Sequence, residues 1–259
     1  MGYFLKEVAP DIVNGDVSNV IQSNKTDKPF GGSDILFDWT SFEIPSGGAR
    51  LESVVVHVMG EDGGTAAEQD LVLYFARTVN GNAPDSLGTV NNAMTTGFNF
   101  PTALVAGVKL EGAESASQII GPAFGDVLIN SPYSAHGLDT RQVFQAEDGV
   151  QTGRAGFDTF YVCGFAGGAY DFSTGVLADG AVTSDTATSI TTKTVDPRKC
   201  FQIGDEVYLH DVDTAIGTVK SMTATNITLN AAIAGGTNIA DEDEFINANP
   251  IRIKLGFSN

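Results

Sequence analysis

The chain has 259 residues and is strongly acidic: 14 lysines and arginines stand against 32 aspartates and glutamates, a formal net charge of −18 at pH 7. Nucleic-acid binding depends on neutralising phosphates with basic side chains, so this balance argues against a nucleic-acid partner. A hydrophobic content of 42% is enough for a packed core, and 30 glycines with only 18% charged residues are typical of a turn-rich β protein.

The N-terminal residues do not resemble a targeting segment. Met1 is followed by Gly-Tyr-Phe-Leu-Lys, which lacks the apolar core of a secretory signal, and Lys6 stands where an N-myristoylation motif needs Ser or Thr. No apolar run approaches the roughly 18 residues of a membrane span, so we expect no membrane partner and synthesis in a cytoplasm. Cys163 and Cys200 form no CxxC motif, and we expect two buried free thiols.

Residues 1–30 carry mixed signals. Val13, Val17, Val20 and Ile21 have helix-like spacing, whereas the proline, the glycine and the polar stretch within the segment argue against a long helix. We therefore expect an N-terminal arm or a short helix. It either packs on its own domain or reaches a neighbouring subunit.

From residue 31 the pattern is one of strands separated by loops rich in glycine and proline. The expected strands cover residues 34–44, 49–59, 70–77, 105–110, 117–120, 127–129, 143–145, 158–165 and 250–257. About eight strands with irregular loops favour an all-β fold, a jelly-roll-like β-sandwich built from residues 31–172 plus 249–259.

The most regular alternation of apolar and polar residues runs from Cys200 to Asn230. Period-two alternation predicts short strands with one buried face, enough for a small SH3-like β-barrel. Strong strand patterns flank this region, so we expect a β-barrel domain at residues 173–248, inserted between the last two strands of the sandwich. Deleting about residues 174–247 should then leave a folded sandwich.

Three segments of this region resemble small β modules in structural proteins of tailed-bacteriophage virions: FQIGDEVYL at 201–209, IGTV at 216–219 and ATNITL at 224–229. The family pattern is F.[IV]GD.VYL, a short turn, IGTV and then [AT]T.ITL, and the resemblance covers residues 190–245. It implies a non-enzymatic virion protein at the capsid surface, a head decoration (cement) protein. Its partners would be the major capsid protein and itself, as a homotrimer. The alternative is a tail- or baseplate-associated carbohydrate-binding or host-recognition module.

Motifs for catalysis are missing from the sequence. His57, His136 and His210 are scattered without zinc-site spacing, and no GxSxG or phosphate-binding glycine motif is present. A glycan hydrolase would need two carboxylates facing each other across a cleft, and the sequence places no such pair. We therefore expect no enzyme activity and no cofactor.

Two acidic clusters could hold calcium, because oxygen-rich loops of β proteins supply carboxylate and carbonyl ligands. One contains Asp62, Glu68 and Asp70, and the other contains Asp241 and Asp243. Neither has EF-hand or repeat spacing, so solvated turns are the favoured interpretation and no metal site is predicted.

Aromatic side chains could stack on sugar rings if they were exposed. Tyr133, in a Ser-Pro-Tyr-Ser loop, and Trp39 are the candidates for the glycan-binding alternative. Tyr74, Tyr161 and Tyr170 could stack in the same way, but strand alternation places most of these aromatics in strands where they fill cores.

Overall fold

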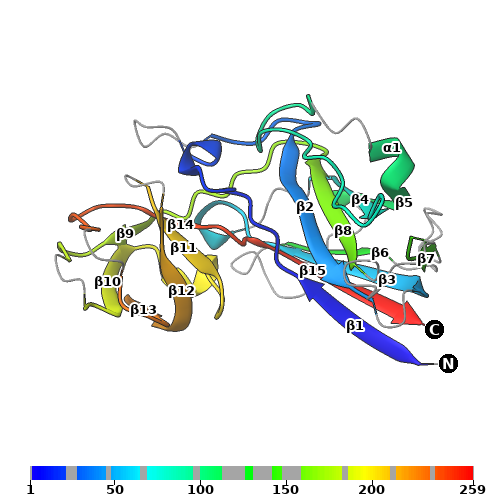
Figure 1. Ribbon diagram of the computed structural model, residues 1–259. Helices are drawn as coiled ribbons and strands as arrows, with labels where there is room; N and C mark the ends of the chain where they lie inside the picture. Colours follow the sequence, from blue (N-terminus) through cyan, green and yellow to red (C-terminus); the bar gives the residue numbers. More distant parts are fainter. Residues whose placement is uncertain are drawn as a thin grey trace.

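The protein is all-β in this computed structural model (Figure 1). The structure describes residues 2–21, 28–44, 48–64, 69–95, 100–112, 126–130, 142–147, 159–182, 186–210, 214–233 and 237–258. Three antiparallel sheets account for the strands of these residues. Two sheets pack as a sandwich, and the third forms a smaller body beside it (Figure 1).

The first sheet of the sandwich has five strands. In the order of pairing they are β1 (Tyr3–Val8), β15 (Ile251–Ser258), β3 (Gly48–Val58) and β6 (Asp126–Asn130), with β7 (Val143–Gln145) also paired to β3. The second sheet has four: β2 (Ile35–Glu43), β8 (Thr159–Ala166), β4 (Leu71–Arg77) and β5 (Leu104–Leu110).

The strand order of the two sheets is that of a jelly roll. When the eight strands other than β7 are numbered along the sandwich, the sheets read 1-8-3-6 and 2-7-4-5. Eight antiparallel strands in two such sheets are the arrangement that viral capsid and lectin domains share. The prediction of an all-β, jelly-roll-like sandwich is confirmed.

Phenylalanine rings from both sheets fill the middle of the sandwich. Neighbouring ring centroids lie 5.3–6.3 Å apart. The rings belong to Phe42, Phe75 and Phe160 of the four-stranded sheet and to Phe144 and Phe257 of the five-stranded sheet. Alternating residues of each strand point inward, so the rings meet in the layer between the sheets, where edge-to-face contacts add to apolar burial.

The third sheet has six strands and its own apolar core. In order of pairing the strands are β14 (Phe245–Asn247), β11 (Glu206–Leu209), β12 (Thr214–Thr223), β13 (Asn226–Leu229), β10 (Ser189–Thr194) and β9 (Val176–Ala178). All of them lie between β8 and β15 in the chain. Figure 1 shows this small module at the left of the view.

The strands of the small module do not close into the β-barrel that the sequence predicts. Its edge strands β9 and β14 do not pair along a ladder: an isolated bridge joins Leu177 to Glu244, the residue before β14, and Ala178 hydrogen-bonds to the backbone of Glu242 and Asp243. Among the described residues the module is therefore a curled, open sheet.

The N-terminal segment forms a strand instead of the expected arm or helix. β1 pairs along its length with β15 of the same chain, from Tyr3 opposite Ser258 to Val8 opposite Ile253. The helix-spaced valines are buried around a single 3-10 turn, η1 (Val17–Asn19). The other short helices are η3 (Glu61–Gly63), α1 (Phe100–Ala103) and α3 (Pro197–Cys200).

Strands occur at the expected positions wherever the structure describes them, and the expected strand at 117–120 lies outside the described residues. No described helix has the length and apolar character needed to cross a membrane.

Candidate functional site

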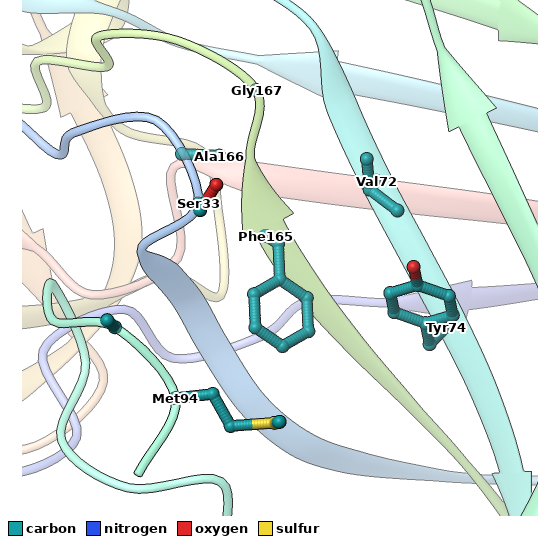
Figure 2. Close-up of a pocket in the computed structure, with 8 residues that line it drawn as sticks. Ser33, Val72, Tyr74, Met94, Phe165, Ala166 and Gly167 are labelled. Carbon is teal, nitrogen blue, oxygen red and sulfur yellow. The ribbon is translucent and has the colours of Figure 1, made fainter. Parts of the chain in front are cut away.

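A pocket of about 500 Å³ opens on the four-stranded sheet (Figure 2). Its floor is formed by Val72 and Tyr74 of β4 and by Phe165 of β8. In β4 these positions alternate with the buried Leu71 and Leu73. The pocket therefore lies on the face of the sheet that points away from the sandwich core.

The shape of the pocket floor follows from strand register. Val72 lies opposite Phe165, and the rings of Tyr74 and Phe165 meet edge to face with centroids 5.8 Å apart. On the other side, Tyr74 lies opposite Gly107 of β5, where an added Cβ would stand 3.2 Å from the tyrosine ring. The glycine leaves room for the ring to lie over β5.

Two loops form the rim of the pocket. Ser33 has a positive φ of 75° and donates its backbone N–H to the Ala166 carbonyl, which fixes the approach to β2. A bridge between Asp34 and Ala93 places Met94, 46% exposed, over the same face. Figure 2 shows the Met94 and Phe165 side chains pointing toward the same space.

The lining of the pocket is mainly apolar and aromatic. The eight described lining residues carry no carboxylate, imidazole, thiol or basic group. Apolar and aromatic groups with a few hydroxyls can hold a ligand by stacking and burial. The Tyr74 phenol is the one titratable group among these eight residues.

The predicted glycan-binding aromatics do not line this pocket. Trp39 is half-buried, packs against the sandwich core and donates its indole N–H to the Asp85 carbonyl at 3.1 Å. Tyr133 lies outside the described residues. Tyr170 is buried, whereas Tyr74 packs against the core and also lines the pocket. The sequence signal for Tyr74 is its position between Leu73 and Phe75, which are both buried.

In the first acidic cluster, the Asp70 carboxylate has partners within the fold. Asp70 lies 2.9 Å from the Lys109 ammonium and accepts the Gly112 N–H. Burial works to raise the pKa of Asp70, but the hydrogen bonds from Lys109 and Gly112 outweigh it, and the pKa is lowered. Asp62 lies in η3, with a φ of 51°. Glu68 lies outside the described residues.

The second acidic cluster is likewise used within the fold. Asp241 accepts hydrogen bonds from Lys193 at 2.7 Å and from the Gly180 N–H at 2.9 Å, while Asp243 accepts the Ala240 N–H. Within the described part of the chain, no group of three or more His, Cys, Asp or Glu side chains is placed to hold a metal ion.

The histidines and cysteines are dispersed. His57 is on β3 and His210 follows β11, in a different sheet, while His136 lies outside the described residues. Burial raises the pKa of the Cys163 thiol well above its usual value and that of Cys200 to about 12. Both thiols are therefore neutral and inert in the folded protein.

A buried polar cluster joins the small module to the sandwich. Asp205 is fully buried, and its carboxylate accepts the Gln202 N–H at 2.6 Å and the Asn247 amide at 2.9 Å. Its other oxygen pairs with the Arg252 guanidinium of β15. Burial lowers the pKa of Arg252, and Glu7, 3.8 Å away, opposes that shift. No local pattern in the sequence marks this role of Asp205, because its partner Arg252 lies 47 residues away.

One strand at the margin of the sandwich has exposed apolar side chains. On β1, Tyr3 is 74% exposed and Leu5 is 73% exposed. β1 ends its sheet, with β15 as its one strand neighbour among the described residues.

Comparisons with known proteins give little. No protein-family model matches the chain, and no curated protein matches it. A solved structure with low similarity is the crystal structure of the Aeromonas sobria serine protease (ASP) and the chaperone (ORF2) complex. It has 8% identity and a TM-score of 0.23, and the match covers 100% of this chain and 27% of that chain. At this TM-score the similarity carries no argument about fold or function.

Proposed function

We propose that this chain is a non-enzymatic structural subunit of a tailed-bacteriophage particle, a head decoration protein that binds and stabilises the lattice of the major capsid protein. The observation that carries the proposal is the small module. Its strands β11, β12 and β13 fall on the three segments that resemble virion β modules, and they enclose a core separate from that of the sandwich.

The jelly roll adds support to a role in a particle, because the fold recurs in viral capsid domains. A decoration protein acts by contact area: many apolar and backbone contacts, each modest, are repeated over a symmetric lattice. The acidic charge of the chain fits such a role, since it suppresses non-specific association away from the lattice.

The test is binding to expanded capsids assembled from the major capsid protein of the same phage. We expect the purified chain to sediment with the capsids, to saturate at a fixed ratio to the capsid subunit, and to raise the temperature at which the shells fall apart. Unexpanded shells serve as the control lattice. Failure to bind either form, with no change in shell stability, would contradict the proposal.

A second candidate function is glycan binding, and the pocket favours it. Tyr74 and Phe165 present ring surface beside the Ser33 hydroxyl in a space of about 500 Å³. Stacking on an aromatic face with one or two hydrogen bonds is a common way to hold a pyranose ring.

A glycan array probed with the wild type and with Tyr74→Ala and Phe165→Ala tests this second function. Binding that both substitutions abolish would support it. Tyr161→Ala is the matched control, because Tyr161 lies on β8 four residues before Phe165, on the same face of the sheet but outside the pocket. Wild-type protein that binds no glycan would rule the second function out.

A further inference from the structure

Among the described residues, β1 pairs with another strand on one side only, so a further strand can add along its other side. β1 has six residues and ends the five-stranded sheet (Figure 1). An edge strand presents backbone N–H and C=O groups that can pair with a further chain. Proteins usually block such edges with charges, prolines or bulges, so the sequence of β1 decides whether its edge is open to pairing.

The side chains of β1 alternate between the two faces of the sheet. Phe4 and Lys6 lie on the side of the sandwich core, and the Phe4 ring stacks on Phe257 with centroids 5.4 Å apart. Leu5 lies on the outer face, opposite Gly256 of β15. Because Gly256 has no side chain and Leu5 is 73% exposed, the leucine is open to a neighbour on the outer face.

The charges on β1 exclude two of its self-pairing registers and allow the one centred on Leu5. When a strand pairs with its own copy about a two-fold axis, one residue opposes itself. Centring on Lys6 or on Glu7 would place like charges directly opposite each other, which is destabilising. Centring on Leu5 places the two leucines together, with Phe4 opposite Lys6 and Tyr3 opposite Glu7.

Charged residues such as Lys6 usually prevent pairing at a strand edge. In the Leu5-centred register, however, Lys6 lies opposite Phe4 of the other copy. The aliphatic part of Lys6 can lie along the Phe4 ring of the other copy with its ammonium near the ring face, a favourable cation–π arrangement. No like charges oppose each other from residue 3 to residue 7.

We propose that two copies of this chain pair through β1, antiparallel and centred on Leu5, so that two five-stranded sheets become one continuous sheet. The partner is a second copy because the Leu5-centred register brings the two exposed Leu5 side chains together and opposes no like charges. The contact is small compared with the interfaces of stable dimers, so the pair forms at high concentration or where a lattice holds the copies close. The pairing does not depend on the proposed function.

The experiment is disulfide trapping with Leu5→Cys. The native Cys163 and Cys200 are buried and do not compete. We expect mild oxidation to convert Leu5→Cys to a covalent dimer that reductant reverses. Val143→Cys is the matched control, because Val143 is 62% exposed on β7 of the same sheet, away from β1. It should form dimer at least about tenfold more slowly, as expected for random collisions of thiols on an acidic protein.

Two further measurements test the pairing register and the equilibrium between monomer and dimer. A mixture of Tyr3→Cys and Glu7→Cys proteins should cross-link to each other faster than either does to itself. In sedimentation equilibrium, the wild type should dimerise with increasing concentration, and Leu5→Lys should weaken the pair by about tenfold or more because two charges then face each other.

The proposal is overturned if Leu5→Cys cross-links no faster than Val143→Cys, or if the wild type stays monomeric across the concentration series. A monomer that still binds expanded capsids would reject the pairing while leaving the proposed function in place.

Discussion

The sandwich and the small module bury apolar surface in different ways. The sandwich fills the gap between two broad sheets with five clustered phenylalanine rings, whereas the module packs mostly Val, Ile and Leu, with Phe201 and Phe245 as its buried rings. A single curled sheet encloses less space, so branched aliphatic side chains are large enough to fill it. The difference suggests that the sandwich sets most of the stability and that the module is the more easily opened part.

The two cores can be observed separately because each contains one cysteine. Cys163 belongs to the sandwich core and Cys200 to the core of the module. Both are buried with raised pKa values, so a thiol reagent reacts only after the surrounding core opens. Labelling of each site along a denaturant series therefore measures the opening of each region.

Deletion of the small module should have the largest effect on stability. Thr174 donates its hydroxyl to the Phe245 carbonyl, so the two ends of the module lie side by side and a short linker can join the flanks after deletion of 174–247. We expect a folded sandwich with Cys163 still protected, but less stable, because Tyr208 and Ile246 belong to the sandwich core and are lost. A chain with Cys163 fully reactive in native buffer would show that the module is not a separable insertion.

Phe144→Ala should be the most damaging single substitution in the sandwich. Its fully buried ring contacts four other phenylalanines, so the cavity left behind should cost about 3–5 kcal/mol of unfolding free energy. Urea unfolding followed by Cys163 labelling measures it. The exposed neighbour substitution, Val143→Ala, should have little effect. A loss below about 1 kcal/mol for Phe144→Ala would show that the ring cluster is not the main support.

Asp205→Asn should loosen the connection between the two regions. The change leaves the Arg252 guanidinium partly buried without its carboxylate, at a cost of about 3 kcal/mol. Glu7→Gln is the control, because Glu7 approaches the same guanidinium from a half-exposed position and should cost under about 1 kcal/mol. Both thiols should label at lower urea in Asp205→Asn, and equal effects of the two substitutions would contradict the role of Asp205.

A small cavity in the module should affect the module alone. Ile227→Val removes one buried methylene group from β13 and should cost about 1 kcal/mol, seen as earlier labelling of Cys200. Ile203→Val, at a position 72% exposed in the same module, should be neutral. If Cys163 shifts as much as Cys200 does, the two cores open together and are not distinct cooperative units.

The smallest expected effect is a loss of sandwich stability at acid pH. Glu147 accepts hydrogen bonds from the Gly81 and Asn80 N–H groups and from Thr78, which lowers its pKa below the usual 4.5. A lowered carboxylate pKa stabilises the fold above about pH 4.5, and that contribution disappears as the pH falls through the folded-state pKa. Glu147→Gln should lack this acid-dependent loss, which is small because the side chain is largely solvated. Melting curves from pH 6 to about pH 3 measure it, and parallel curves for the two proteins would contradict it.

Local patterns in the sequence were sufficient to predict the strands that carry them. The alternation in β12 and the apolar run of β3 placed both strands, and the count and loop lengths indicated the jelly roll. Long-range features had no such signal: the pairing of β1 with β15 joins residues about 250 positions apart. The pocket combines side chains from two loops and two strands, so no single stretch of sequence reveals it.

The pairing of β1 with β15 also determines how the molecule responds to mechanical force. Tyr3 lies opposite Ser258, so a pull applied through these two residues acts at the same end of one antiparallel ladder. The load then falls on one pair of backbone hydrogen bonds at a time, and the strands separate by unzipping at low force. Tension between Tyr3 and a residue at the far end of β15 would instead shear the whole ladder at once. The molecule is therefore mechanically weak along its own termini and much stiffer along the strand axis.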